Sequence, residues 1–166
     1  MVSKLITPRL LVDPLTKDDS GFIFKLVNTA EWIEFIGNRN VVTLKDASDY
    51  IQKILYGPNS YCWVARLRDN QIPIGIITFL KHEYVQHFDL GFAFLPDFTG
   101  QGYAFEASAA VLQEIKADPM HSQILGITLA NNKRSIRLLE KLGMKFSEEI
   151  KVGQEQLMVY AIQLEG

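Results

Sequence analysis

This sequence has a single cysteine, no long apolar run and no large excess of charge, and each of these shortages excludes a class of protein. The single cysteine, Cys62, can form neither an internal disulfide nor a cysteine-based metal site, so we expect the reducing environment of the cytoplasm. The apolar stretch near the N-terminus is broken by Pro8 and Arg9, which leaves it too short for a signal-peptide core. No run approaches the length that spans a membrane, and we expect no membrane partner.

The balance of charge argues against nucleic acid as a partner. Lysine and arginine number 17 and aspartate and glutamate 19, so no sequence-wide positive excess exists to collect phosphates. His82 and His87 bracket one polar loop, but no third ligand accompanies them, and we expect no metal. The polarity of the loop accounts for both histidines, so neither is expected to act in catalysis.

The sequence does contain enough apolar material for one core. Of its 166 residues, 48% are hydrophobic and 22% are charged, which is typical of a globular protein. No repeat, low-complexity tract or linker interrupts them. We therefore expect a single domain over residues 1–166.

The first third of the chain predicts one strand followed by helices. An aliphatic run predicts a strand near residues 5–13. Thr16 with Asp19, and Thr43 with Asp46, resemble capping boxes, and apolar residues at helical spacing follow each pair. We expect two helices here, with a short helical turn between them.

The remainder of the chain alternates between strand and helix periods. The expected elements are strands at 60–67, 72–80 and 88–95, a helix at 104–115, a strand at 124–129, a helix at 133–142, and strands at 146–152 and 156–164. Short polar turns join the first three of these strands, which predicts an antiparallel meander. The order β-α-α-β-β-β-α-β-α-β-β predicts a mixed sheet with helices on its faces.

A glycine-rich loop between a strand and a helix is the most informative segment. Gly100 and Gly102 precede a helix of small residues. Glycine lets a phosphate approach the backbone, and unpaired first-turn N–H groups with the helix dipole favour negative charge, so the loop suits a pyrophosphate. A tight turn that needs positive φ explains the same glycines. Phe105 replaces the third glycine of a dinucleotide fold, and no Gly-Lys-Ser/Thr follows, which excludes a P-loop.

Two other segments resemble the GNAT superfamily of N-acetyltransferases, particularly its Rim-type branch of ribosomal-protein N-terminal acetyltransferases. Residues 131–144 resemble the asparagine-x-x-serine helix of that family, with its Leu-Glu-Lys-Leu-Gly ending. Residues 7–12 and 15–19 resemble the first strand and helix of the branch. Together with the glycine loop, the resemblance covers most of the chain in the family's order.

The resemblance implies the GNAT fold, which is an α/β (α+β) arrangement. Its sheet is mixed, mostly antiparallel and seven-stranded, with four or so helices, and its parallel strands 4 and 5 splay apart. In this chain those two strands would end near Leu95 and Leu129. A bulge in the first of them would force the splay.

The resemblance also implies acetyl-CoA as the cosubstrate, with its pantetheine arm between the two splayed strands. Main-chain groups of Phe94 and Leu95 would contact the arm. Asn132 would bond the arm near its amides, although Asn132 also suits a plain helix cap. The residues that would hold the pyrophosphate are Phe98, Thr99, Gly100, Gln101, Gly102, Tyr103 and Ala104.

Three positions depart from the family pattern. Asp97 stands where the phosphate motif usually begins with glutamine or arginine, a change that binding through backbone amides survives. Leu139 matches the position of a tyrosine that many members use as the general acid for the departing thiolate, so the identity of the acid is left open. Met144 replaces a common phenylalanine with another apolar residue.

Two residues are candidates for proton transfer. Ser135 lies where some relatives place a hydroxyl beside the sulfur, and would act as the acid or organise a water; solvation of the first helical turn is the alternative. Asp89 matches an acidic position on the fourth strand of many relatives, and would accept the amine proton directly or through water. A strand-end carboxylate facing solvent is the alternative for Asp89.

These observations favour an acyltransferase that moves an acetyl group from acetyl-CoA to a primary amine by direct attack in a ternary complex. A protein N-terminus or a small amine would be the acceptor, and no motif distinguishes the two. The alternative is a non-catalytic acyl-CoA-binding or regulatory module. Pairing of the C-terminal strands at a sheet edge would allow a homodimer.

Overall fold

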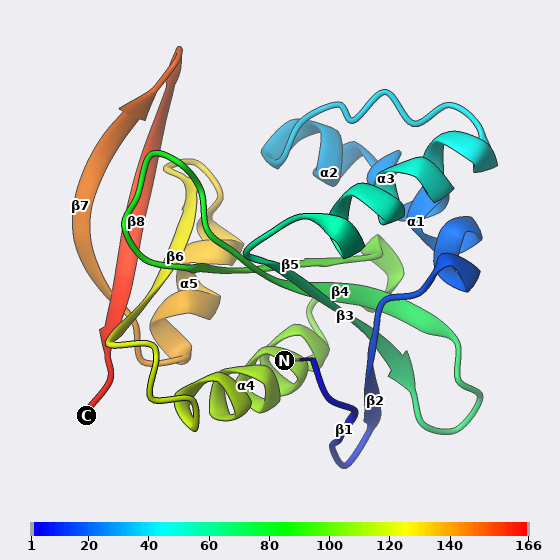
Figure 1. Cartoon of the computed structure of the whole chain (residues 1–166), viewed down its shortest axis with the longest axis horizontal. Coiled ribbons are helices and arrows are strands. Elements are labelled where there is room, and N and C mark those ends of the chain that lie inside the picture. The colour runs from blue at the N-terminus through cyan, green and yellow to red at the C-terminus, as the bar shows by residue number, and fades with distance from the viewer. Residues whose placement is uncertain (1, 166) are drawn as a thin grey trace.

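One sheet runs through the molecule, in the spatial order β1-β2-β3-β4-β5-β6-β8-β7 (Figure 1). The computed structural model describes residues 2–165. Its strands are β1 (Leu5–Ile6), β2 (Leu10–Pro14), β3 (Ser60–Leu67), β4 (Pro73–Leu80), β5 (Asp89–Phe94), β6 (Gln123–Leu129), β7 (Lys145–Val152) and β8 (Glu155–Gln163). Its helices are α1 (Ser20–Val27), α2 (Ala30–Phe35), α3 (Leu44–Tyr56), α4 (Tyr103–Lys116) and α5 (Lys133–Lys141), with short 3-10 turns η1 (Lys17–Asp19) and η2 (Pro96–Phe98).

The pairing of the strands confirms a mixed, mostly antiparallel sheet. Only β5 and β6 pair in parallel among the described strands, and β3, β4 and β5 form the predicted meander. The single strand predicted over residues 5–13 is divided into β1 and β2, because the chain turns at Thr7, whose N–H donates to the Leu10 carbonyl at 2.9 Å. This hairpin gives the described sheet eight strands where seven were expected.

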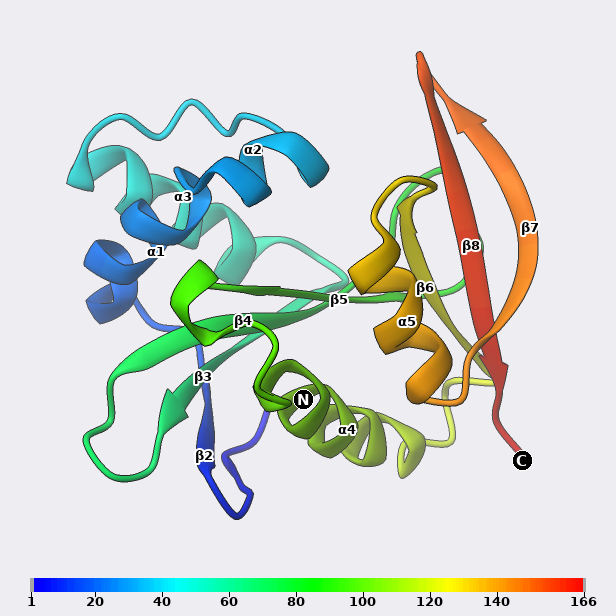
Figure 2. The ribbon, with the colours of Figure 1, turned by 180° about the vertical axis from the view of Figure 1, so that it is seen from behind.

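Helices cover both faces of the sheet (Figures 1 and 2). Helices α1, α2 and α3 lie on one face, and α4 and α5 lie on the other. Strand β3 shows how both faces are filled: Trp63 belongs to the core beneath α4, and Val64 to the core beneath α1 and α3. Successive strand side chains point to opposite faces, so a strand that is buried on both sides reads as a continuous apolar run.

Local sequence signals set the ends of the helices. Both members of the predicted capping boxes, Thr16 with Asp19 and Thr43 with Asp46, form their reciprocal hydrogen bonds. The predicted helical turn between the two early helices is α2. Helix α5 gives way at Gly143, as predicted, with a left-handed φ of +95° that glycine adopts without strain.

Candidate active site

The turn between β5 and α4 presents a row of unpartnered main-chain N–H groups. Among the described residues, the N–H groups from Gly100 to Phe105 donate to no protein acceptor. Gly100 and Gly102 have φ of +74° and +85°, left-handed values at which a side chain is strained. Gly100, Gln101 and Gly102 are exposed, so the turn is open to a ligand. Because α4 begins at Tyr103, its dipole adds positive potential at the same place.

Two residues expected in this row have their N–H groups engaged elsewhere. The Phe98 N–H donates to the Leu95 carbonyl at 2.9 Å, and the Thr99 N–H donates to the Pro96 carbonyl at 3.2 Å. These bonds close η2, a turn that the fixed φ of proline favours. The main-chain donors available to an anion therefore begin at Gly100, and Phe98 and Thr99 do not belong to them.

Strands β5 and β6 are joined at one end only. Asp89 opposite Leu125 is their single registered pair, and the Leu125 N–H donates to the Phe88 carbonyl at 2.9 Å. In a parallel ladder the Ile127 N–H would next reach the Leu90 carbonyl. It donates instead to the Asp89 carboxylate, with an N to Oδ1 distance of 3.0 Å. A side chain thus replaces a main-chain acceptor, and beyond this point the two strands no longer pair.

The divergence leaves main-chain groups of β5 facing the gap. The Leu95 N–H donates toward β4, to the Ile74 carbonyl at 2.8 Å. Main-chain groups alternate in direction along a strand, so those of Phe94 and Phe92 point toward β6. Phe94 keeps its main chain available to an arm in the gap, and Leu95 does not. The expected bulge in β5 is wrong, because the β4–β5 register is unbroken; Asp89 accounts for the splay.

Asp89 is buried at the closed end of this gap. Only 9% of the residue is exposed, so it is not the solvent-facing carboxylate considered as an alternative. Its Oδ2 lies 3.0 Å from Nε2 of His82, whose ring stacks on Tyr84 with centroids 4.9 Å apart. Burial raises the pKa of Asp89 above its usual range, and the hydrogen bonds from His82 and the Ile127 amide oppose that rise.

Helix α5 borders the open side of the gap with Asn132 and Ser135. The Asn132 Oδ1 accepts the Ser135 N–H at 3.3 Å, so Asn132 does cap the helix, and it stays half-buried. The Ser135 hydroxyl is half-buried and has no hydrogen-bond partner among the described residues. Leu139, at the position of the usual tyrosine, is 1% exposed and packs over Gly126 of β6. Leucine has no proton to donate, so Leu139 cannot serve as the general acid.

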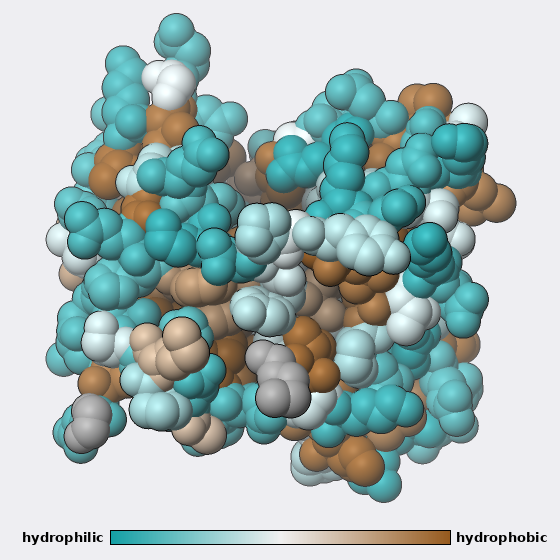
Figure 3. All heavy atoms as spheres, in the orientation of Figure 1, coloured by the Kyte–Doolittle hydropathy of each residue, from teal (hydrophilic) through white to brown (hydrophobic). Residues whose placement is uncertain are grey.

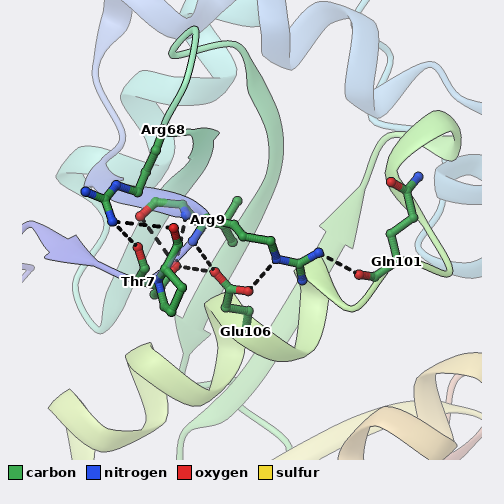
Figure 4. A network of polar contacts seen from close by, with 7 residues as sticks. Thr7, Arg9, Arg68, Gln101 and Glu106 are labelled. Carbon is green, nitrogen blue, oxygen red and sulfur yellow. Dashed lines mark hydrogen bonds and ion pairs between the residues drawn. The ribbon is translucent and has the colours of Figure 1, made fainter.

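A network of hydrogen bonds connects the glycine loop, residues 100–102, to the N-terminal hairpin (Figure 4). Arg9 donates from Nε to Glu106 Oε1 at 2.8 Å and from Nη1 to the Gln101 carbonyl at 3.0 Å. Its guanidinium also lies over the Tyr103 ring, 4.2 Å from the centroid. Thr7 donates to the same carboxylate. Arg9 thereby holds the Gln101 carbonyl and the first turn of α4 in a fixed relation.

Glu106 is the centre of this network. Burial acts to raise the pKa of Glu106, but the hydrogen bonds from Thr7 and Arg9 outweigh it and hold the pKa below its usual range. The carboxylate is therefore charged at neutral pH and accepts from both residues. It joins β1 and β2 to α4 across about a hundred residues of chain.

The surface is hollowed between the β7–β8 hairpin and the helices α1 to α3 (Figure 3). Hydrophilic residues form most of the rim, and more apolar residues lie deeper. Asp89, Gly91 and Ala93 point to the face of β5 that carries α1 to α3, because Ala93 packs against the core on that side and side chains alternate. An acceptor in this hollow would thus reach β5 from the face opposite α4.

The single cysteine does not take part in this site. Cys62 is 5% exposed, and burial raises the pKa of its thiol to about 12. It therefore carries no thiolate at neutral pH. Within residues 2–165, no group of three His, Cys, Asp or Glu side chains is placed to hold a metal ion. No helix of the described chain has the length and apolar character needed to cross a membrane.

Comparison with known families agrees with this geometry. The model of the acetyltransferase (GNAT) domain matches residues 9–145. The chain belongs to the GNAT acetyltransferase family. The matched segment includes the N-terminal hairpin from Arg9, the glycine loop, the gap between β5 and β6, and α5. The protein is therefore an acetyltransferase, and the resemblance identified from the sequence is confirmed.

Known relatives of this GNAT acetyltransferase are distant in sequence and close in fold. An uncharacterized N-acetyltransferase of Bacillus subtilis, YnaD, is 27% identical over 141 residues, which are 85% of this chain and 82% of YnaD. The crystal structure of a GNAT-family acetyltransferase from Bacillus anthracis superposes with a TM-score of 0.81 at 24% identity, covering 99% of this chain and 100% of that one.

Rim-type structures are among the neighbours in fold. The ribosomal-protein-S5-alanine acetyltransferase of Vibrio fischeri has a TM-score of 0.83 at 12% identity, over 98% of this chain and 97% of that one. RimL, a ribosomal L7/L12 α-N-protein acetyltransferase solved in complex with coenzyme A, has a TM-score of 0.84 at 11% identity, over 98% of each chain. At such identities these structures establish the fold alone.

Sequence reasoning missed three features of the GNAT site. It gave His82 no role, although His82 is bonded to Asp89. It omitted Phe92, whose main chain faces the gap, and the bond between Arg9 and Glu106. The signals for the His82–Asp89 bond were visible in the sequence: an acidic residue begins a strand, and a histidine lies in the loop before it. Neither signal is informative without the other.

Proposed function

We propose that this GNAT acetyltransferase moves an acetyl group from acetyl-CoA to a primary amine by direct attack in a ternary complex. The observation that carries the proposal is the row of unpartnered N–H groups from Gly100 to Ala104, at the start of α4 and beside the gap between β5 and β6. A diphosphate satisfies such a row, since its oxygens accept several N–H groups while the helix dipole favours its charge. The bound coenzyme A of RimL supports the choice of ligand.

The remaining contacts follow the path of the pantetheine arm. From the diphosphate the arm would enter the gap, where Phe94 and Phe92 offer main-chain groups that no strand partner uses. Asn132 stands on the opposite wall, and its side-chain nitrogen is a donor for an amide carbonyl of the arm. Gln101 and Tyr103 would flank the diphosphate.

The thioester would lie near the closed end of the gap, where the chemistry needs proton transfer but no enzyme nucleophile. The amine must lose a proton to attack, and Asp89 together with its bonded neighbour His82 would receive that proton. The Ser135 hydroxyl would donate to the departing sulfur. The raised pKa of the Cys62 thiol argues against an acyl-cysteine intermediate and in favour of direct transfer.

The acceptor is either a protein N-terminus or a small amine. Two neighbours in fold are a ribosomal-protein-S5-alanine acetyltransferase and a ribosomal L7/L12 α-N-protein acetyltransferase, which makes N-terminal peptides the first class to test. The lone buried Cys62 favours the cytoplasm as the compartment of the reaction. Release of free thiol from acetyl-CoA, followed over N-terminal peptides, polyamines and aminoglycosides, tests activity and acceptor class together.

A substitution at Gly102 tests the coenzyme site itself. The Gly102→Ala variant places a Cβ at a φ of +85°, and that Cβ would lie 3.2 Å from Nη2 of Arg9, so the row of N–H groups is displaced. A left-handed backbone costs an alanine about 1–2 kcal/mol, and 1.4 kcal/mol is about tenfold in affinity. We expect the KM for acetyl-CoA to rise about tenfold or more.

The matched control is Gly153→Ala, in the β7–β8 turn. Its φ is +61° and its Cβ would meet nothing within 4 Å, so it suffers a similar strain far from the coenzyme. The control should lose stability with no change in the KM. Equal KM values for both variants would contradict the proposed diphosphate site.

The rival function is a non-catalytic acyl-CoA-binding module, favoured by the absence of a tyrosine at Leu139. Both functions predict that acetyl-CoA raises the melting temperature. Only the enzyme releases thiol in the presence of an amine. Thermal stabilisation by acetyl-CoA without thiol release from any amine in the panel would support the module.

A further inference from the structure

Both oxygens of the Asp89 carboxylate are already engaged. Oδ1 accepts the Ile127 N–H at 3.0 Å, and Oδ2 lies 3.0 Å from Nε2 of His82. With 9% of the residue exposed, an incoming amine has little access to either oxygen. A carboxylate held in this way can orient a neighbour but is poorly placed to meet the substrate.

His82 is the neighbour that it orients. An ionised carboxylate can only accept a hydrogen bond, so Nε2 carries the proton and donates it to that bond, which leaves the lone pair of the neutral imidazole on Nδ1. Nδ1 has no hydrogen-bond partner among the described residues, and 29% of the side chain is exposed. The Tyr84 ring lies nearly parallel to the imidazole, at an angle of 13°, and restricts its rotation. One ring nitrogen is thus fixed by Asp89 while the other is open.

The surface beside this pair has small side chains. Gly91 and Ala93 follow Asp89 along the same face of β5. A Cβ at Gly91 would lie 2.6 Å from the Thr78 hydroxyl of β4, so glycine is needed there. This leaves open the face of β5 along which an amine would approach the gap.

Charged and titratable groups of three elements lie around His82, and in its own loop Lys81 donates from Nζ to the Val85 carbonyl at 3.1 Å. Asp89 of β5 faces it directly, and Tyr84 of its own loop stacks on it. Glu155 of β8 lies near enough to Tyr84 to act on it, since burial raises the pKa of Tyr84 and the charges of Asp89 and Glu155 add to that rise. The carboxylates of Asp89 and Glu155 favour a substrate that arrives as an ammonium ion.

We infer that His82 is the group that takes the proton from the amine, and that Asp89 positions it. The inference rests on the proposed acetyl transfer. The ammonium gives one proton to Nδ1 of His82, and the freed lone pair of nitrogen forms the C–N bond with the thioester carbonyl carbon. The C–S bond breaks, the second nitrogen-bound proton ends on the coenzyme sulfur, and His82 returns its proton to water.

The substitution His82→Gln separates this role from a structural one. The Gln Nε2 group can still donate to Asp89 and hold the loop, but an amide does not accept a proton at neutral pH. We expect kcat to fall about 100-fold, within the range usual for loss of a general base, while the KM for acetyl-CoA is unchanged. The control is His87→Gln, a change in the same loop at a residue that forms no hydrogen bond or ion pair with Asp89 in the described structure, and it should leave kcat unaltered.

The pH dependence of the rate separates the two roles, because a His82 that only held the loop in place would not change it. A general base must be unprotonated to act, so kcat/KM of the unmodified protein should decrease as the pH is lowered. With the same amine throughout, the pH dependence of the amine cancels in the ratio of the unmodified rate to the His82→Gln rate, and a decrease of that ratio at low pH belongs to His82. Added imidazole should raise the rate of His82→Ala and not that of His82→Gln.

The outcomes distinguish this inference from the proposed function. Turnover by the unmodified protein, combined with a His82→Gln rate within about threefold of it, overturns the role of His82 and leaves acetyl transfer intact. Absence of thiol release from the unmodified protein, despite thermal stabilisation by acetyl-CoA, overturns the proposed acetyl transfer and this inference together.

Discussion

Asp89 is a carboxylate that the fold holds in an unfavourable place. Burial raises its pKa, which means that the folded protein favours its neutral form more than the unfolded chain does. Its contribution to stability is therefore fully present below the ordinary pKa of 3.8 and is lost as pH rises through the raised folded value. A charge that is retained against stability is typical of a functional site.

The Asp89→Asn variant tests whether the charge of Asp89 lowers stability and supports activity. The amide oxygen can still accept the Ile127 N–H, and the penalty of burying a charge disappears, so the melting temperature at pH 7 should be equal or higher. Thiol release should fall about 100-fold, because the amide nitrogen donates to Nε2 of His82. The proton of the imidazole then lies on Nδ1, which can no longer accept a proton from the amine. Measured at pH 4, the difference in melting temperature should shrink. A less stable variant with full activity would contradict this assignment.

Glu106 behaves in the opposite sense. Although burial acts against its charge, hydrogen bonds from Thr7 and Arg9 lower its pKa, so the stability it contributes is present above the ordinary pKa of 4.5 and is lost as pH falls through the lower folded value. Glu106→Gln should cost about 0.5–1.5 kcal/mol at pH 7, less than a buried charge-assisted hydrogen bond, because the Arg9 side chain is 43% exposed and solvent screens the pair. Urea unfolding at pH 7 and at pH 3 measures this cost and its pH dependence. A cost that does not decrease at pH 3 would contradict the stabilising role of the Glu106 charge.

At the scale of elements, the close approach of α5 to β6 positions Asn132 and Ser135. A Cβ at Gly126 would lie 2.4 Å from a Leu139 methyl group, so Gly126→Ala should push α5 outward. Overpacking of this kind costs about 1–3 kcal/mol. We expect a lower melting temperature and a higher KM for acetyl-CoA. Gly21→Ala in α1 is the control, because its Cβ meets nothing within 4 Å, and it should stabilise the protein by about 0.5–1 kcal/mol.

Elements whose signals are local could be predicted from the sequence. The helices that follow Thr16 and Thr43 begin at capping boxes, and the meander is separated by polar turns, so neighbouring residues suffice to define them. The β1–β2 hairpin was not predicted, because β1 has only two residues, Leu5 and Ile6, too few to show a strand pattern of their own.

The candidate site depends on contacts between residues that are distant in sequence. The bond from Asp89 to Ile127 joins two strands separated by a helix, and the bond from Arg9 to Glu106 joins opposite parts of the chain. No periodicity encodes such bonds. The glycine loop was predicted because its chemistry is local, but the engagement of the Phe98 and Thr99 amides depends on the turn that begins at Pro96.

At the scale of the whole molecule, the sheet consists of two leaves. Strands β1 to β5 form one and β6 to β8 form the other, and a single registered pair together with the Asp89 carboxylate fastens them along their shared border. An acyl-CoA lying along that border would replace the missing rungs with its own amides. The loaded protein would then unfold as one cooperative body, whereas in the empty protein we expect local opening to begin at this border, where the leaves share a core but few sheet bonds.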